Sequence, residues 1–168
     1  MRAITRCALV ALVLIGCVAC DQISKGAARE YLPGTGIHSY LGDTFRLEYA
    51  ENPGAFLSLG ESWPSTVRYD GLVIGVGAFL LVLLAWAVLS SRLRWPQRIA
   101  IAAIGAGGAS NLLDRIRFEG TVTDFLNLGI GSLRTGIFNV ADVILTLGFI
   151  LLLLGWNRLP SAKPVDES

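Results

Sequence analysis

Four apolar segments alternate with polar ones along the 168 residues of this chain. They lie at about residues 4–22, 71–91, 98–114 and 136–157. The second segment contains no charged residue, and a helix of about 20 apolar residues spans the ~30 Å hydrocarbon core of a membrane. The pattern therefore predicts an α-helical polytopic membrane protein, with four transmembrane helices in a single domain over residues 1–158.

The third segment differs from the others because it is rich in alanine and glycine. Small side chains let neighbouring helices approach one another closely inside a membrane. We therefore expect residues 98–114 to form the packed interior of the helix bundle.

The polar stretches between the spans, about residues 23–70 and 115–135, predict a small β element. Residues 44–49 alternate apolar and polar side chains, which is the period of a half-buried strand. An Asn-Pro-Gly sequence at 52–54 predicts a turn after that strand. Residues 122–126 have the pattern of a second extended segment, so we expect both strands on the same side of the membrane.

An amphipathic patch after the predicted turn indicates a short helix at the membrane surface. The patch consists of Phe56, Leu57, Leu59 and Trp63. Aromatic and aliphatic side chains grouped in this way suit the boundary between lipid and water. We expect this interfacial helix to lie beside the β element.

Positive charges indicate which side of the membrane each loop faces. Four spans place both termini on one side, and the basic residues of that side are Arg2, Arg6, Arg92, Arg94, Arg98, Arg158 and Lys163. Basic residues near span ends mark the cytoplasmic side. We therefore predict cytoplasmic termini, periplasmic loops at 23–70 and 115–135, and a disordered cytoplasmic tail at 159–168.

Composition supports a membrane protein and argues against several other classes. Hydrophobic residues make up 53% of the chain and charged residues 16%, against about 25% charged residues in a typical soluble domain. The net charge of +1, without a basic cluster, argues against a nucleic acid partner. All three cysteines lie in the first span, so no disulfide framework is available. His38 is the single histidine, which argues against a zinc site.

Two carboxylates at the edge of the predicted membrane carry the candidate chemistry. Asp142 lies about one turn into an apolar span, with no basic residue within six positions on either side. A carboxylate there needs a partner from elsewhere in the chain, and Asp124, between apolar Val122 and Phe125, can supply it. Two apposed carboxylates share one proton, so one can activate water while the other polarises a carbonyl group. The pair therefore indicates peptide hydrolysis of the aspartic type.

Two alternatives remain open at this point. A small transporter or proton-linked channel would use Asp124 and Asp142 to carry ions or protons. The run Leu14-Ile15-Gly16-Cys17 resembles a lipoprotein cleavage box, so the chain can itself be a lipoprotein processed at Cys17. The sequence contains no HExxH, GxSxG or P-loop motif that would indicate a different hydrolytic chemistry.

Further polar residues share helix faces near these candidates. Residues three or four positions apart lie on one face of a helix, and this spacing groups Asn111 with Asp114 and Arg115, and Asn139 with Asp142. We interpret Asp114 as a structural residue that caps the helix end and pairs with Arg115 and Arg117.

Five blocks of the sequence, taken in order, resemble the lipoprotein signal peptidases, also called signal peptidase II. The first span ends in Asp21-Gln22-Ile23-Ser24-Lys25, which is similar to the Asp-Gln-x-Ser/Thr-Lys of that family. The other blocks are Asn52-Pro53-Gly54-Ala55, Gly107-Gly108-Ala109 with Asn111-Leu112-Leu113-Asp114-Arg115, Val122-Thr123-Asp124-Phe125, and Phe138-Asn139-Val140-Ala141-Asp142. The chain departs from the family pattern at Phe56-Leu57, where a second alanine and an aromatic residue usually follow the second block.

The resemblance implies an intramembrane aspartic protease of the bacterial inner membrane. It would cut the signal peptide from diacylglyceryl-modified prolipoproteins just before the lipidated cysteine, near the periplasmic face. Asp124 and Asp142 would form the catalytic dyad, without a metal or a cofactor. Substrate-binding or dyad-supporting roles would fall to Asp21, Asn52, Asn111, Arg115 and Asn139, and structural roles to Lys25, Gly54 and Asp114. The partners would be the prolipoprotein and membrane lipid, and we expect a monomer.

Overall fold

The computed structural model describes residues 3–54 and 64–156. The predicted interfacial patch at Phe56, Leu57, Leu59 and Trp63 lies outside these residues, as does the predicted tail at 159–168. Helices make up most of the described chain. Their bounds are α1 Ala3–Tyr31, α2 Ser65–Asp70, the π-helical η2 Gly71–Gly75, α3 Val76–Leu89, α4 Trp95–Arg117 and α5 Val140–Trp156.

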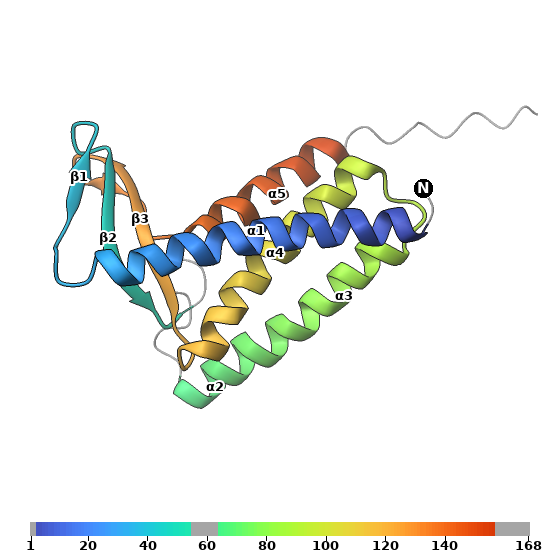
Figure 1. Cartoon of the computed structure of the whole chain (residues 1–168), viewed down its shortest axis with the longest axis horizontal. Helices are drawn as coiled ribbons and strands as arrows, with labels where there is room; N and C mark the ends of the chain where they lie inside the picture. The colour runs from blue at the N-terminus through green and yellow to red at the C-terminus, as the bar shows by residue number, and fades with distance from the viewer. Residues whose placement is uncertain (1–2, 55–63, 157–168) are drawn as a thin grey trace, which may run out of the picture.

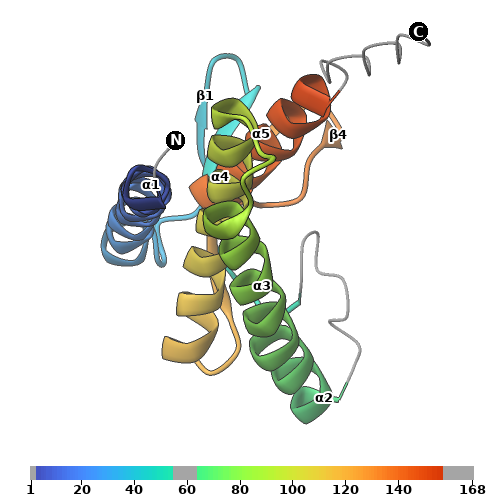
Figure 2. The same ribbon diagram turned by 90° about the vertical axis from the view of Figure 1, so that its right-hand side faces the viewer.

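The helices form a bundle in which α4 contacts α1, α3 and α5 (Figure 1 and Figure 2). Elements α2, η2 and α3 form one continuous rod because Asp70, Gly75 and Val76 all keep right-handed helical backbone angles. The start of α1 and the end of α5 lie at the same end of the bundle (Figure 1). The connection between α3 and α4 lies at that end as well, so successive rods run in opposite directions.

Within the described residues, a four-stranded antiparallel sheet lies at the other end of the bundle (Figure 1). Its strands follow the order β1 His38–Tyr40, β2 Phe45–Asn52, β3 Val122–Ile130 and β4 Leu133–Arg134. The extended segments predicted at 44–49 and 122–126 are therefore confirmed. The predicted combination of a helical fold with a small β element is confirmed as well.

Several predicted boundaries differ from the structure. The second helical rod begins with α2 at Ser65 rather than at 71, and α4 extends over Trp95–Arg117 rather than 98–114. Helix α1 continues past residue 22 as far as Tyr31, so the beginning of the predicted first loop is helical. Helix α5 begins at Val140 rather than at 136. The reason is that Phe138 pairs with Leu126 of β3 in an isolated antiparallel bridge. The apolar residues just before Val140 thus extend the sheet and not the helix.

Helix α4 is the buried centre of the bundle, as its small residues predict. Several of its alanines are fully buried, namely Ala100, Ala102 and Ala106. A Cβ atom at Gly105 would come within 2.5 Å of the Leu84 side chain on α3. One at Gly107 would come within 2.5 Å of the Ala141 carbonyl oxygen on α5. The glycines therefore allow α3 and α5 to approach α4 closely.

The outer surface of the bundle is suited to lipid. Two helical stretches, Ala3–Tyr31 and Gly71–Leu89, are long and apolar enough to cross a membrane, and α5 has a shorter apolar stretch at Val140–Gly155. Large apolar side chains cover their outer faces, among them Leu12, Leu81 and Leu153. Soluble monomeric proteins rarely expose large continuous apolar areas, so this surface fits a membrane environment.

Gly107→Ala is expected to destabilise the protein by about 1–3 kcal/mol. The added methyl group would meet the Ala141 carbonyl oxygen at 2.5 Å and Leu145 Cβ at 3.1 Å. Thermal unfolding in detergent measures the change. Gly16→Ala is the control, because a Cβ atom there has no neighbour within 4 Å and alanine favours a helix. Equal unfolding midpoints for the two variants would contradict the tight contact between α4 and α5.

Candidate active site

Strand β3 and helix α5 bring Asp124 and Asp142 together. Asp124 lies on β3 and is 2% exposed, and Asp142 lies in the first turn of α5. The bridge between Leu126 and Phe138 joins β3 to the segment that leads into α5. Both carboxyl groups, which we call the carboxyl pair, therefore meet where the sheet adjoins the helix bundle.

Three asparagine side chains surround the carboxyl pair. Asn52 Nδ2 donates to Asp124 Oδ2 at 2.9 Å, and Asn139 Nδ2 donates to Asp124 Oδ1 at 2.6 Å. Asn111 Nδ2 donates to Asp142 Oδ1 at 3.0 Å. Asn139 Nδ2 also donates to Asn111 Oδ1 at 3.1 Å. In the described part of the chain the two carboxyl groups share no direct hydrogen bond, and these amides connect them.

Asn139 and Asp142 also cap the N-terminus of α5. Asn139 Oδ1 accepts a hydrogen bond from the backbone N–H of Asp142 at 3.0 Å. In return, Asp142 Oδ2 accepts from the backbone N–H of Asn139 at 3.1 Å. This reciprocal arrangement is a capping box, and it explains why the helix begins at Val140. An Asn-x-x-Asp sequence before an apolar run is the signal that would have predicted this start.

The turn at 52–54, predicted from sequence, is confirmed and positions Asn52. The backbone N–H of Gly54 donates to Asn52 Oδ1 at 2.9 Å, which leaves the amide N–H groups to face Asp124. The Arg115 guanidinium donates to the Gly54 carbonyl and to the Asn111 carbonyl. Arg115 therefore holds the turn against α4.

Burial raises the pKa of Asp124 to about 6. The hydrogen bond from Asn52 lowers this pKa, the charge of Asp142 raises it, and the hydrogen bond from Asn139 lowers it. Asp124 consequently keeps its proton to a higher pH than an ordinary aspartate. A carboxyl group that holds a proton near neutral pH is suited to acid–base chemistry.

A buried ionic cluster lies next to the carboxyl pair, between α1 and α4. Lys25 Nζ is 2.8 Å from Asp21 Oδ2, 3.1 Å from Asp114 Oδ2 and 2.7 Å from Asn111 Oδ1. Lys25, Asp21 and Asp114 are fully buried. Arg29 lies 3.8 Å from Asp114 and brings a second positive charge to the cluster.

Asp21 connects this cluster to the start of α5. Its Oδ1 accepts from the backbone N–H of Ala141 at 2.7 Å, and its Oδ2 accepts from Ser110 Oγ at 2.7 Å. Reasoning from the sequence assigned no role to Gln22 and did not single out Ser110. Gln22 Nε2 donates to Ser110 Oγ at 3.0 Å and to Asp114 Oδ1 at 2.8 Å. The signal for Ser110 was a hydroxyl group inside an otherwise apolar predicted span.

The ion pairs predicted for Asp114 were wrong. Arg115 and Arg117 are its neighbours in sequence, but its ion pairs are formed with Lys25 and Arg29 of α1. Adjacent residues on a helix point in different directions. Arg115 consequently faces the turn at 52–54, while Asp114 faces α1.

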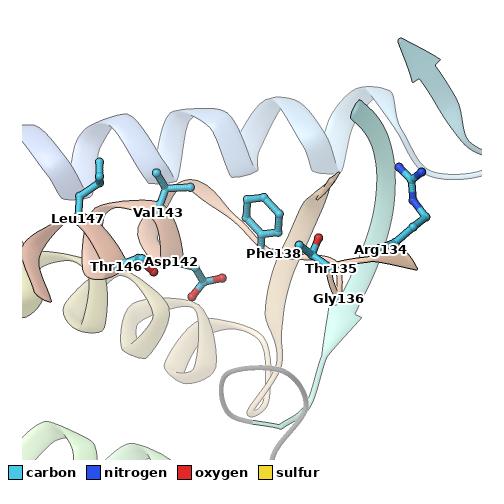
Figure 3. A pocket seen from close by; sticks show the side chains of 8 residues that line it. All are labelled: Arg134, Thr135, Gly136, Phe138, Asp142, Val143, Thr146 and Leu147. Atoms are coloured by element: carbon cyan, nitrogen blue, oxygen red, sulfur yellow. The ribbon is translucent and has the colours of Figure 1, made fainter. Parts of the chain in front are cut away.

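A cavity of about 530 Å³ opens beside Asp142. Its walls are formed by the first two turns of α5 and by the segment after β4, and they include apolar Phe138, Val143 and Leu147. Figure 3 shows Leu147 at one end of the cavity, Arg134 at the other and Phe138 between them. An elongated apolar group can therefore bind along α5 next to the carboxyl pair.

Comparison with known proteins relates the chain to one family of peptidases. The family described as signal peptidase (SPase) II matches residues 13–157. The lipoprotein signal peptidase of Desulforapulum autotrophicum is 31% identical, over 95% of this chain and 97% of that protein. The lipoprotein signal peptidase of Pelodictyon phaeoclathratiforme is 30% identical, over 88% of this chain and 90% of that protein.

Two solved structures of bacterial membrane enzymes have the same fold. Their TM-scores are 0.75 and 0.76, with sequence identities of 22% and 21%. The matches cover 91% and 89% of this chain, and 93% and 92% of the solved chains. The match over residues 13–157 and the identities with full-length relatives show that this chain belongs to the signal peptidase II family.

Proposed function

We propose that this chain removes the signal peptide from diacylglyceryl-modified prolipoproteins by cutting just before the lipidated cysteine. Membership of the signal peptidase II family supports this reaction and this substrate. The observation that carries the proposal is the link between Asp124 and Asp142 through Asn139, beside an apolar cavity. The relatives quoted above are peptidases, so they give the transporter alternative no support.

The carboxyl pair would hydrolyse the peptide bond by two coupled proton transfers. With one proton on the pair, the ionised carboxylate takes a proton from water, and the protonated carboxyl gives its proton to the scissile carbonyl oxygen. The water oxygen bonds to the carbonyl carbon and forms a tetrahedral diol. The newly protonated carboxyl then protonates the leaving nitrogen, the other recovers a proton from the diol, and the C–N bond breaks. This series of steps requires no metal or cofactor.

The other predicted residues would support the pair from defined positions. Asn111 and Asn139 orient the two carboxyl groups, and Asp21 holds the first turn of α5 through Ala141. Asn52 lies in the turn at 52–54, and Arg115 of α4 donates to the Gly54 carbonyl of that turn; both would bind the substrate backbone beside Asp124. Structural roles would fall to Lys25, Gly54 and Asp114.

We place the chain in the bacterial inner membrane as one domain over residues 1–158. The four spans would be α1, the α2–η2–α3 rod, α4 and α5, with the apolar stretches of α1, Gly71–Leu89 and α5 in support. The sheet would face the periplasm. Both termini and the tail at 159–168 would lie on the cytoplasmic side, as the basic residues predict. The carboxyl pair would then lie at the outer boundary, where a lipid-anchored substrate arrives laterally. A monomer suffices, because one chain supplies both carboxyl groups.

A gel-mobility assay tests the proposed reaction. Purified protein in detergent is mixed with a diacylglyceryl-modified prolipoprotein and, separately, with the unmodified precursor. We expect the lipid-modified precursor alone to be shortened. If a well-folded protein cleaves neither precursor, the proposal is wrong, and a proton flux in liposomes would then favour the transporter.

Leu147→Trp is expected to raise the KM for the lipid-modified substrate by roughly tenfold or more. The indole would fill the cavity beside Asp142, where we expect the lipid-bearing residue to bind. Leu151→Trp is the matched control. Leu151 lies one turn further along α5, outside the cavity, with 52% exposure against 53% for Leu147. Steady-state kinetics with a lipopeptide measure both variants, and an equal rise in KM would mean that the substrate does not enter this cavity.

A further inference from the structure

We propose that Lys25, acting through Asn111, keeps Asp142 ionised, so that Asp124 carries the single proton of the carboxyl pair. Lys25 would then be a positioning residue in addition to a structural one. The inference rests on the proposed peptidase function. It assigns the role of general base to Asp142 and the role of general acid to Asp124.

The contacts of Lys25 are the first step of the argument. Its ammonium group is fully buried and has three N–H donors and no acceptor. Its three short contacts are with Asp21 at 2.8 Å, Asp114 at 3.1 Å and Asn111 Oδ1 at 2.7 Å. Two donors therefore serve carboxylates of the ionic cluster, and the third is left for the amide oxygen of Asn111.

The orientation of the Asn111 amide is the second step. Its oxygen accepts from Lys25 and, at 3.1 Å, from Asn139 Nδ2. Its nitrogen must therefore face Asp142 Oδ1, at 3.0 Å. In this orientation Asn111 donates a hydrogen bond to Asp142 and cannot accept one. A donor favours the ionised form of a carboxyl group, and a cation on the amide oxygen strengthens that donor.

The place of Asp142 in the fold is the third step. Asp142 lies in the first turn of α5 and accepts from the backbone N–H of Asn139 at 3.1 Å. The N-terminus of a helix stabilises a negative charge. Asp124 lies on a strand and accepts hydrogen bonds from the side-chain amides of Asn52 and Asn139; burial raises its pKa to about 6. The two members of the pair are therefore unequal.

Charged groups of both signs surround Asp142. They come from α1, α4, β3 and β4, and are Asp21, Lys25, Asp114, Arg115, Asp124 and Arg134. Arg115 interacts electrostatically with both members of the pair, so it does not distinguish them. The charge of Lys25 also acts on both members of the pair. Its two consecutive hydrogen bonds through Asn111 lead to Asp142, and this route distinguishes the two carboxyl groups.

Lys25→Met tests the inference through the pH dependence of kcat/KM. Without the cation, the pair acquires its single negative charge at a higher pH. We therefore expect the acid limb of the pH profile of kcat/KM to move to higher pH by about one unit. We also expect kcat to fall by about tenfold while KM changes little, because the Asn111 amide can turn once Lys25 no longer donates to it. A shift in neither the acid limb nor kcat would overturn the inference.

Arg29→Met is the matched control, because it also removes one positive charge from the ionic cluster. Arg29 contacts Asp114 at 3.8 Å and Thr123 at 2.8 Å, and it makes no contact with Asn111 within the described residues. Its pH profile should match that of the wild type. Equal shifts in Lys25→Met and Arg29→Met would show that the total charge of the cluster matters and that the route through Asn111 does not.

A second variant and a second measurement cover the case in which Lys25→Met does not fold. The double variant Lys25→Met with Asp114→Asn removes one charge of each sign. Compared with Asp114→Asn alone, the acid limb of its pH profile should move by the same amount as Lys25→Met moves it in the wild type. Infrared spectroscopy of the wild type at pH about 5 should show a protonated carboxyl band that Asp124→Asn removes. A band that persists in Asp124→Asn would place the proton on Asp142 and overturn the inference.

The infrared result does not depend on turnover. If the band behaves as expected but the lipid-modified precursor is not cleaved, the proton assignment stands and the proposed peptidase function fails. If cleavage occurs but the band persists in Asp124→Asn, the function stands and the assignment fails.

Discussion

Replacing either Asp124 or Asp142 by asparagine is expected to lower kcat for the lipid-modified precursor by roughly 10²–10⁴-fold or more. An amide can neither take a proton from water nor give one to the scissile carbonyl. KM should change little, because asparagine has the size and shape of aspartate. Single-turnover cleavage followed on gels measures the loss. The double variant should be no slower than the slower single variant, because the two groups act as one unit.

Glu51→Gln is the matched control for these substitutions. Glu51 is an exposed carboxylate on β2 next to Asn52, and it accepts a hydrogen bond from Tyr49 at 3.0 Å. We expect full activity in this variant. All variants should elute as the wild type does on gel filtration in detergent. Substantial activity in either aspartate variant would contradict the assignment of the carboxyl pair.

Asp114→Ala is expected to lower the free energy of unfolding by about 3–5 kcal/mol. The substitution leaves buried Lys25 with one carboxylate instead of two. It also removes the acceptor for Gln22 Nε2, at 2.8 Å, and for the backbone N–H of Thr123, at 3.2 Å. The polar contacts that Asp114 makes with α1 and β3 are lost together. Unfolding in detergent, by heat or denaturant, measures the change.

Glu30→Ala provides the comparison for Asp114→Ala. Glu30 is exposed near the end of α1, and substitutions at such surface positions usually change stability by less than about 0.5 kcal/mol. The stability loss of Asp114→Asn should lie between those of Asp114→Ala and Glu30→Ala, because the amide oxygen of the asparagine can still accept one hydrogen bond. A stability loss for Asp114→Ala no larger than that for Glu30→Ala would mean that the ionic cluster does not hold α1 to α4.

Local patterns were sufficient to predict most elements of the fold. The alternation at 44–49 and the Asn-Pro-Gly turn after it depend on neighbouring residues alone, and both are present. The same holds for the packing of α4, because glycine and alanine allow close approach whatever helix lies opposite. The start of α5 was predicted wrongly because Phe138 is apolar, like the residues of the span that follows it. Phe138 pairs with β3, and hydrophobicity alone does not distinguish an apolar residue in a strand contact from one in a helix.

Contacts between distant segments limited the prediction of the site. Spacing on a helix grouped Asn139 with Asp142, but it grouped Asn111 only with Asp114 and Arg115. The structure brings Asn111, Asn139 and the carboxyl pair into one hydrogen-bonded group. The partner of Asp114 is Lys25, which is remote in sequence and meets it only because α1 packs against α4. No local pattern encodes that pairing, so reasoning from neighbours selected Arg115 instead.

The continuity of α1 bears on autoproteolysis. Its sequence, with Gly16 followed by Cys17, resembles a lipoprotein cleavage box. The bond before Cys17 nevertheless lies inside an uninterrupted helix from Ala3 to Tyr31, which the ion pair between Lys25 and Asp114 joins to α4. A protease needs its target bond in an exposed, extended backbone. We therefore expect the helical shape of this segment to protect it from the chemistry proposed for the carboxyl pair.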